Sequence, residues 1–420
     1  MLPLMIATMT IMMAIGIPVA VAIGLASLVG IGGFMTVPLI VIPQQAFVAL
    51  DKFPLAAIPF FILAGNIMAD GGISRRLVDL VESCVYSIRG GILLTCIFTA
   101  LIFGAVSGSS VATTLAVGAI LIPAMVRRGY PVGFAAALQA TAAELSVLIP
   151  PSIPMIIYGL SANVSVGDLF VAGIGPGLLV AVALSAFVLA YTRYKGYAEI
   201  REDVRPPFFP ALRHSSLALL MPIIVLGGIY GGVFTPTEAS VVAVGYSLIV
   251  TLFIYKELNL KGLVAVVRRS AISSAVVMFI VSMAGIFSFV LTRAGVPASI
   301  GNWITDTFTD PISFLLAVNL FLFVMGMFVE TSASIVVLGP ILAPVAIQFG
   351  IDPTYFGIVM IFNLALGMIT PPLGVNLFAA CAVANIGIEK MVPHLLPLIG
   401  VILLCLALVT FVPAISLFLI

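Results

Sequence analysis

Residues 121–154 read LIPAMVRRGYPVGFAAALQATAAELSVLIPPSIP, and residues 342–375 read LAPVAIQFGIDPTYFGIVMIFNLALGMITPPLGV. Each stretch contains the end of an apolar arm, a turn with charged residues, and a long apolar segment broken by Pro-Pro. The matching positions lie at one constant offset: Pro123 and Pro344, Gly129 and Gly350, Pro150-Pro151 and Pro371-Pro372. Because chance rarely produces such a match, we infer an internal repeat. We predict one copy in residues 1–210 and the other in residues 211–420.

The composition of the chain is that of a membrane protein. Hydrophobic residues make up 62% of the 420 residues and charged residues only 8%, which leaves too few polar side chains to cover a soluble globule. Each spanning helix needs about 20 apolar residues, so we expect an all-α polytopic protein of the bacterial inner membrane with about ten spans. The 17 basic and 16 acidic residues give no excess charge that would attract nucleic acid.

Five apolar stretches in each half are predicted to span the membrane. They lie near 4–28, 34–49, 54–69, 130–160 and 169–192, and again near 215–234, 238–255, 271–292, 354–384 and 395–419. An odd number of crossings turns the second copy upside down, which is an inverted-topology repeat. The stretch 34–49 is short and contains two prolines, Pro38 and Pro43, so it either crosses or only dips into the membrane.

Charge predicts which side the loops face. The residues of two basic loops are Arg193, Lys195, Arg201, Arg205 and Arg213, and Lys256, Lys261, Arg268 and Arg269. By the positive-inside rule both loops are cytoplasmic. The amino terminus is then outside if 34–49 crosses and inside if it does not. It runs straight into an apolar stretch without a basic region, so we expect no cleaved signal peptide.

Each half also contains two apolar arms around a polar tip. Residues 90–127 have the tip Ser107-Gly108-Ser109-Ser110 and basic ends, and residues 311–347 have the tip Glu330-Thr331-Ser332 with Asp310 and Asp352 at the ends. The arms of the first segment, roughly 91–104 and 111–126, are predicted to be too short to span, and its basic ends lie on one side, so we predict a re-entrant hairpin. The matching segment, with acidic ends, is predicted to be a second hairpin that enters from outside. Irregular backbone at membrane depth is tolerated where it is buried in protein or lines a wet cavity. The two tips are therefore candidate binding sites, and we expect them to meet.

The long segments 130–160 and 354–384 are interrupted at Pro150-Pro151 and at Thr370-Pro371-Pro372, because proline removes a backbone donor and breaks a helix. Freed carbonyls and hydroxyls beside a hairpin tip suit Na+. The side-chain oxygens available are those of Ser107, Ser109, Ser110, Thr331, Ser332, Thr370 and Asn376. The alternative is that these small residues only let helices approach closely.

Few charges lie within the predicted spans. Glu144 either faces the cavity and accepts hydrogen bonds from substrate hydroxyls or pairs with a partner that the sequence does not identify. Glu238 follows Thr235-Pro236-Thr237 and is predicted to cap a helix. The amphipathic stretches 73–88 and 296–308 are predicted to lie in the membrane interface.

Neither catalysis nor a bound cofactor is expected. The sequence has no P-loop, GxSxG or HExxH motif. The four cysteines, Cys84, Cys96, Cys381 and Cys405, are far apart within apolar runs. We interpret them as packing residues rather than metal or redox ligands.

Essentially the full chain resembles the large membrane subunit of tripartite ATP-independent periplasmic (TRAP) transporters, within the ion-transporter superfamily. The stretches that carry the resemblance are FPLAAIPFFILAGNIM (53–68), GAVSGSSVATTLAVGAILIPAM (104–125), LIPPSIPMIIYG (148–159) and GIDPTYFGIVMIFNLALGMITPPLGVNLF (350–378). The resemblance implies Na+-coupled uptake of a small organic acid by an elevator mechanism. It also implies two partners, a small membrane subunit of about four helices and a periplasmic binding protein.

The same resemblance implies two Na+ sites. The first would be formed by Ser107, Gly108, Ser109, Ser110, Pro150, Pro151 and Ser152, and the second by Glu330, Thr331, Ser332, Thr370, Pro371, Pro372 and Gly374. We place the substrate at Glu144, Ser110, Asn376 and Thr370.

One segment departs from the family pattern. Family members often read GTLG or similar where this chain has Ala143-Glu144-Leu145-Ser146. A fixed carboxylate there would repel a second substrate carboxylate but could bind hydroxyls, so we favour sialic acid or another sugar acid over a C4-dicarboxylate. The alternative functions are a binding-protein-independent Na+ symporter or antiporter of the same superfamily and a passive channel subunit.

Overall fold

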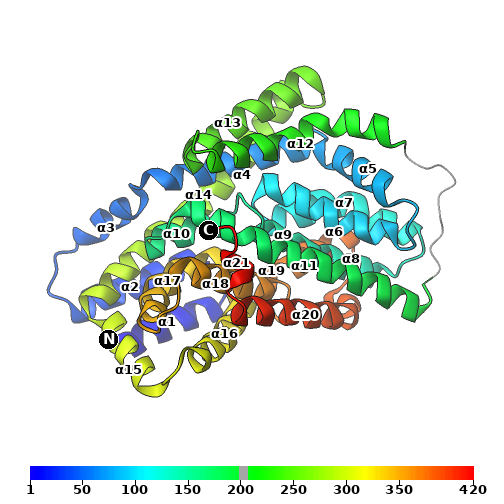
Figure 1. Ribbon diagram of the computed structural model, residues 1–420. Coiled ribbons are helices and arrows are strands. Elements are labelled where there is room, and N and C mark those ends of the chain that lie inside the picture. Colours follow the sequence, from blue (N-terminus) through cyan, green and yellow to red (C-terminus); the bar gives the residue numbers. More distant parts are fainter. Residues whose placement is uncertain (198–206) are drawn as a thin grey trace.

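The computed structural model describes residues 1–197 and 207–420, in which every regular element is helical (Figure 1). Among the described residues, nine helices are long and apolar enough to cross a membrane, or ten if the bent pair Val132–Leu148 and Ile153–Ala162 counts as one span. This confirms the predicted all-α polytopic class with about ten spans. Arg201 and Arg205, which were part of the charge argument, lie outside the described residues.

The first half contains α1 (Leu2–Ala14), α2 (Val19–Phe34), α3 (Val41–Leu50), η1 (Phe53–Ala56), α4 (Ala57–Asp70), α5 (Ile73–Val85), α6 (Gly91–Ser107), α7 (Ser110–Arg127), α8 (Val132–Ala143), α9 (Leu145–Leu148), α10 (Ile153–Ala162) and α11 (Val166–Lys195). The second half contains α12 (Phe208–Tyr230), α13 (Pro236–Leu248), η2 (Ile249–Ile254), α14 (Leu260–Arg293), α15 (Val296–Thr307), α16 (Pro311–Phe328), α17 (Thr331–Gln348), α18 (Pro353–Met368), α19 (Val375–Ala384), α20 (Ile388–Phe411) and α21 (Ala414–Leu417). Thr235 and Glu238 form a capping box at the start of α13, which confirms the capping role of Glu238.

Residues 4–28 do not form one spanning helix, and that prediction was wrong. Gly16 has a φ of +86°, and Pro18 caps α2, so the chain turns between α1 and α2. A Cβ on Gly30 would lie 2.7 Å from the Met5 sulfur, which places the end of α2 beside the start of α1. The apolar run is interrupted because glycine permits the left-handed turn and proline prevents the helix from continuing through it.

The stretch 34–49 contains α3, a helix of 10 residues, which is half of the roughly 20 that a span needs. It packs along α14, and the Ser282 hydroxyl donates to the Ala46 carbonyl at 3.1 Å. Its length fits the interpretation in which this stretch does not cross by itself. The side on which the amino terminus lies stays a prediction.

The arms of the first hairpin are slightly longer than predicted. α6 has 17 residues and α7 has 18, so α7 reaches the length of a span and α6 does not. The argument that both arms are too short was therefore wrong for α7. α6 continues to Ser107, where Gly108 ends it in the left-handed conformation, and Ser109 caps α7 by accepting a hydrogen bond from the Ala112 N–H. In the second segment, α16 and α17 have 18 residues each, and Glu330 caps α17 by accepting a hydrogen bond from the Ala333 N–H.

Both long segments are broken at Pro-Pro, as predicted. One break separates α9 from α10 and the other separates α18 from α19, and both Pro-Pro peptide bonds are cis. α10 and α19 have 10 residues each, and each ends at an asparagine in the left-handed conformation, Asn163 or Asn385. α10 packs on α17, and α19 packs on α7. Each short helix thus contacts the hairpin of the other half.

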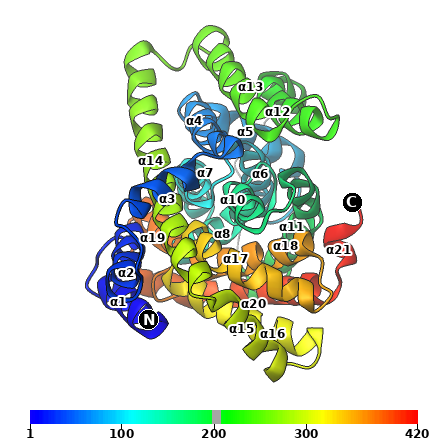
Figure 2. The ribbon, with the colours of Figure 1, turned by 90° about the vertical axis from the view of Figure 1, so that its left-hand side faces the viewer.

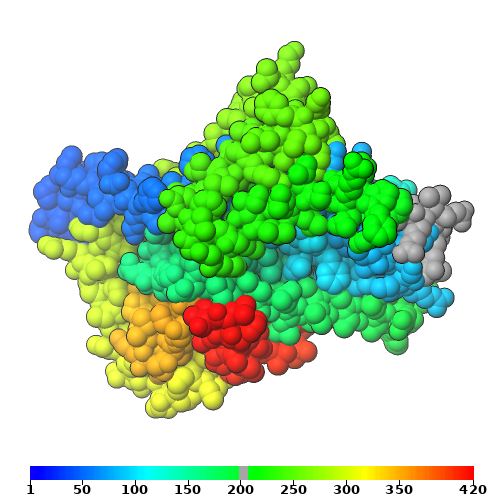
Figure 3. All heavy atoms as spheres, turned by 45° about the horizontal axis from the view of Figure 1, so that its top comes forward, coloured from blue at the N-terminus to red at the C-terminus, as the bar shows by residue number. Residues whose placement is uncertain are grey.

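The remaining helices surround the hairpins. We call α1–α4 and α12–α14 the frame, and the hairpins, the broken helices, α11 and α20 the inner bundle. α14, with 34 residues, runs along one side of the molecule from α13 to α15 (Figure 2) and packs on α2, α3 and α4. In the space-filling view, the green helices α12–α14 rise as a ridge over the rest (Figure 3).

The amphipathic stretches form α5 and α15, and α5 links the frame to the inner bundle. Near its start, Arg76 pairs with Glu257 at 2.6 Å and lies 3.7 Å from the centre of the Tyr255 ring. Near its end, Glu82 forms an ion pair with Arg128, at the end of the first hairpin. Tyr255 and Glu257 lie in the loop after η2, next to the frame, whereas Arg128 belongs to the inner bundle. The helix α5 therefore contacts both the frame and the inner bundle.

Candidate ion and substrate site

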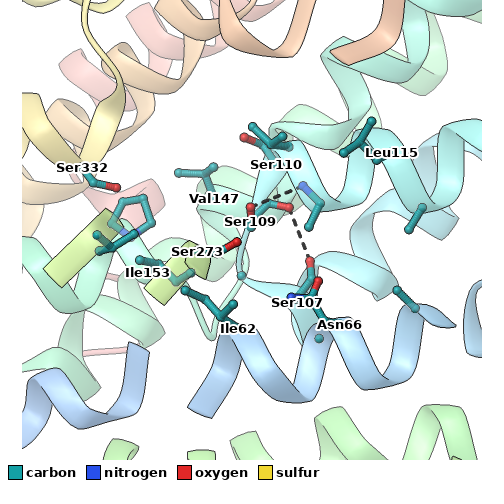
Figure 4. A pocket seen from close by; sticks show the side chains of 18 of the residues that line it. Ile62, Asn66, Ser107, Ser109, Ser110, Leu115, Val147, Ile153, Ser273 and Ser332 are labelled. Carbon is teal, nitrogen blue, oxygen red and sulfur yellow. Dashed lines mark hydrogen bonds between the residues drawn. The ribbon is translucent and has the colours of Figure 1, made fainter. Parts of the chain in front are cut away.

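A cavity of about 520 Å³ lies between the two hairpin tips and the frame. Its inner wall includes residues 107–112 of the first tip and 330–332 of the second, and its outer wall comes from α4 and α14. Figure 4 shows Ser107, Ser109 and Ser110 of the first tip, with Asn66 of α4 and Ser273 of α14 among the lining residues. The structure thus brings both predicted tips to one cavity.

The first tip contacts the break of the first long segment. The Ile153 N–H donates to the Gly108 carbonyl at 3.4 Å. Gly108 has a φ of +61°, and a Cβ there would lie 2.5 Å from the Pro151 carbonyl oxygen. Only glycine fits both the left-handed backbone and this close approach. Gly108, Pro151 and the start of α10 therefore form one continuous surface.

A network of hydroxyls supports this tip, and the sequence analysis missed its central member, Thr113. The Thr113 hydroxyl lies 3.0 Å from the Ser107 hydroxyl and 2.7 Å from that of Ser146, and it donates to the Ser109 carbonyl at 2.9 Å. Thr113 follows Ser109 by one helical turn, a spacing that places both on one face. That spacing was the signal available in the sequence.

Ser152, at the break, has a hydroxyl without a partner. Its side chain is fully buried, and its oxygen has no hydrogen-bonding partner among the described residues. Buried polar oxygens are rarely left unpaired in native proteins. This oxygen is free to act as a ligand.

The second tip is arranged differently. The Glu330 carboxylate accepts hydrogen bonds from the Ala333 N–H at 3.1 Å and from the Ser332 hydroxyl at 2.9 Å. The Thr331 hydroxyl contacts the Met368 sulfur at 3.0 Å. The Thr370 hydroxyl turns back to the Leu366 carbonyl at 2.8 Å. The tip thus meets the last residue of α18, and the Thr370 hydroxyl, just beyond the end of α18, is paired with a carbonyl of that helix.

Three of the four candidate substrate residues lie together, one in the cavity wall and two behind it. The Asn376 amide donates to the Glu144 carboxylate, and the Ser110 hydroxyl is a second polar neighbour of that carboxylate. Ser110 lines the cavity, whereas Glu144 and Asn376 are buried. Asn376 is therefore the partner of Glu144 that the sequence did not identify.

The outer wall contains polar residues that the sequence analysis did not select as site residues. α4 contributes Asn66 and Asp70, and α14 contributes Arg269 and Ser273. Each pair is spaced four residues apart, which places its members on one helix face. A polar pair at that spacing in an apolar helix was the available signal.

The chain matches the family model described as "Tripartite ATP-independent periplasmic transporter, DctM component" over residues 6–415. It is 44% identical to the isethionate TRAP transporter permease protein DctMQ of Oleidesulfovibrio alaskensis, over 99% of this chain and 66% of that protein. It is 41% identical to the C4-dicarboxylate TRAP transporter large permease protein DctM of Pseudomonas aeruginosa, over 89% of this chain and 87% of that protein. It is 35% identical to the sialic acid TRAP transporter large permease protein SiaM of Vibrio cholerae, over 90% of this chain and 88% of that protein.

Two solved structures have a similar fold. The Alcanivorax borkumensis YdaH transporter matches with a TM-score of 0.65 and 17% identity, over 88% of this chain and 86% of that chain. Neisseria gonorrhoeae MtrF matches with a TM-score of 0.61 and 15% identity, over 94% of this chain and 93% of that chain. At these identities the likeness concerns the fold alone.

The family match defines the class of protein: a transporter permease rather than an enzyme. The chain belongs to the DctM family, the large permeases of TRAP transporters. It is therefore a multi-pass protein of the bacterial inner membrane that serves organic acid uptake. As the permease of a tripartite system, it implies a small membrane subunit and a periplasmic binding protein as partners.

Proposed function

We propose that this permease couples the uptake of a small organic acid to Na+ by an elevator mechanism. A periplasmic binding protein delivers the acid, and a small membrane subunit of about four helices extends the frame. In this proposal the halves 1–210 and 211–420 are inverted repeats, and the segments 90–127 and 311–347 are re-entrant hairpins. The inner bundle moves past the frame with substrate and Na+.

The unpartnered Ser152 hydroxyl is the observation that carries the Na+ proposal. The hydroxyls of Thr99 and Thr114 are also buried without a partner, but they lie within helices. Ser152 lies at a helix break beside a hairpin tip, where freed backbone carbonyls and hydroxyls suit Na+. Ser152 belongs to the first proposed site, with Ser107, Gly108, Ser109, Ser110, Pro150 and Pro151. The repeat supports an equivalent second site formed by Glu330, Thr331, Ser332, Thr370, Pro371, Pro372 and Gly374.

The substrate is proposed to bind at the first tip and the residues behind it, which are Ser110, Glu144, Asn376 and Thr370. A cavity of about 520 Å³ is within the range of small-ligand pockets. The relatives are named for isethionate, C4-dicarboxylates and sialic acid. Because Glu144 would repel a second carboxylate, we favour sialic acid or another sugar acid, with a C4-dicarboxylate next.

The Na+ proposal is tested by the thermal unfolding midpoint of the purified protein in NaCl and in choline chloride. Na+ should raise the midpoint of the wild type, and Ser152→Ala should require higher Na+ concentrations for the same rise. The matched control is Thr99→Val, which removes another buried hydroxyl without a partner from the arm α6. A wild-type protein that does not respond to Na+, or a Ser152→Ala variant with the wild-type response, contradicts the proposal.

The substrate preference has a separate test. Uptake of labelled N-acetylneuraminate and of succinate should be compared in the wild type and in Glu144→Gln. We expect the wild type to prefer the sugar acid and the variant to gain relative activity for succinate, because the variant lacks the carboxyl group that is proposed to repel a second substrate carboxylate. An unchanged preference in the variant would remove Glu144 from this role.

A further inference from the structure

The outer wall of the cavity contains an ion pair that the Na+ sites do not use. The Arg269 guanidinium of α14 binds the Asp70 carboxylate of α4 at 2.8 Å. Beside it, the Asn66 amide donates to the Ser270 hydroxyl at 2.9 Å. Arg269 and Asp70 both line the cavity. A guanidinium repels Na+, so its place on this wall requires another explanation.

The balance of charge in the cavity makes Arg269 important for an acidic substrate. The charged residues in the described lining are Arg269, Asp70 and Glu330. The Glu330 carboxylate is occupied by its hydrogen bonds at the start of α17. With Asp70 neutralising Arg269, the lining has a net negative charge. Apart from bound Na+, Arg269 is the cationic group in the described lining, and an organic acid can pair with it if the guanidinium turns from Asp70 to the acid.

The ion pair is suited to such an exchange. The side chain of Arg269 is 56% exposed and that of Asp70 is 40% exposed. Exposed ion pairs of this kind contribute about 0–1 kcal/mol, so replacing Asp70 by another anion costs little. The planar guanidinium presents several N–H donors in a fork that matches two oxygens of a carboxylate or sulfonate.

We propose that Arg269 is an anion subsite on the frame, which binds the acidic group of the substrate after it leaves the hairpin tips. Asp70 competes for the same guanidinium and so promotes release. Arg269 belongs to the basic segment Lys256 to Arg269, which the predicted orientation places at the cytoplasm, so the subsite lies at the exit. This inference rests on the proposed uptake function and adds a specificity residue on the frame.

The test measures the apparent Kd of isethionate, N-acetylneuraminate and succinate by ligand-induced shifts of thermal unfolding, on the permease with its small subunit. Arg269→Gln should weaken binding about tenfold, which corresponds to about 1.4 kcal/mol, and Arg269→Lys should restore part of the affinity. Asp70→Asn should tighten binding, because the competing carboxylate is removed. Arg268→Gln, which removes a neighbouring charge outside the cavity lining, should leave the Kd unchanged.

The outcomes separate this inference from the proposed function. Wild-type binding that Arg269→Gln does not weaken overturns the subsite and leaves organic acid transport intact. Asp70→Asn binding that weakens as much as Arg269→Gln overturns it too, because the pair would then only hold α4 to α14. If none of the three anions binds the wild type, the proposed substrate class fails and the subsite fails with it.

Discussion

At the scale of single residues, the first hairpin tip depends on hydroxyls and glycines in contact with the broken helix. Thr113 joins Ser107, Ser109 and Ser146, and Gly108 fits against Pro151. The polar tip and the Pro-Pro break were predictable, because serine runs and prolines are unusual within apolar segments. The contact between Glu144 and Asn376 was not predictable, because the two residues lie in different halves of the chain and no short-range sequence spacing relates them.

Thr113→Val tests the hydroxyl network. We expect the free energy of unfolding to fall by about 1–3 kcal/mol, because buried hydrogen-bonding groups lose their partner. Thr114→Val is the matched control, since the buried Thr114 hydroxyl has no partner among the described residues, and it should leave stability unchanged or raise it. Equal thermal unfolding midpoints for the two variants would show that the network contributes nothing.

Gly104→Ala tests the close packing of the hairpin on the broken helix. A Cβ there would lie 2.6 Å from the Cα of Ser146, and overpacking of this kind costs about 1–3 kcal/mol. The control is Gly245→Ala in α13, where a Cβ meets open space and the substitution favours the helix. A midpoint for Gly104→Ala as high as that of the control would mean that α6 shifts without cost.

At the scale of elements, most helices followed from hydropathy and from glycine and proline positions. The predicted spans near 54–69, 169–192, 215–234, 238–255 and 271–292 each overlap a candidate span of the structure. The one near 395–419 is shifted, because α20 begins at Ile388 and ends at Phe411. The failures have local causes: Gly16 and Pro18 split the first span, and the first hairpin's arms reach the tip because Gly108 ends α6 and Ser109 caps α7. Hydropathy alone does not register caps or turns.

The ion pair between Glu82 of α5 and Arg128, at the end of the first hairpin, can be tested by mutation. Glu82→Ala removes the carboxylate that pairs with Arg128, whose side chain is 7% exposed, and breaking a buried pair costs about 3 kcal/mol. Thermal unfolding should show a lower midpoint than for the wild type. A midpoint within error of the wild type would mean that α5 does not depend on this pair.

Asp79→Asn, on the same helix, is the control. It also removes a carboxylate from α5, but it should not lower the stability of the folded state. Burial, and next the nearby Glu82, raise the pKa of Asp79, so its ionised form destabilises the folded state at neutral pH. The variant should be as stable as the wild type or more stable at pH 7. This advantage should shrink as the pH falls and Asp79 becomes protonated. A less stable variant at pH 7 would contradict this account.

At the scale of the whole molecule, the elevator proposal requires the first tip to move along α4. A Cβ on Gly65 would lie 3.4 Å from the Ser107 Cβ, close to the separation in disulfides. Gly65→Cys with Ser107→Cys, in a background without the four native cysteines, should cross-link under oxidation. Because Ser107 is a proposed Na+ ligand, the reference is the same double variant in its reduced form, and oxidation should lower uptake below that reference. Full uptake by the cross-linked protein would contradict movement between these parts.

The central claim is that this permease performs Na+-coupled uptake of an organic acid delivered by a binding protein. The most direct measurement is uptake of radiolabelled sialic acid into proteoliposomes that hold the permease and its small subunit, with the Na+ gradient and the binding protein each added or withheld. The account predicts uptake only when both are present. Uptake without the binding protein would favour a binding-protein-independent symporter, and uptake without a Na+ gradient would contradict the coupling.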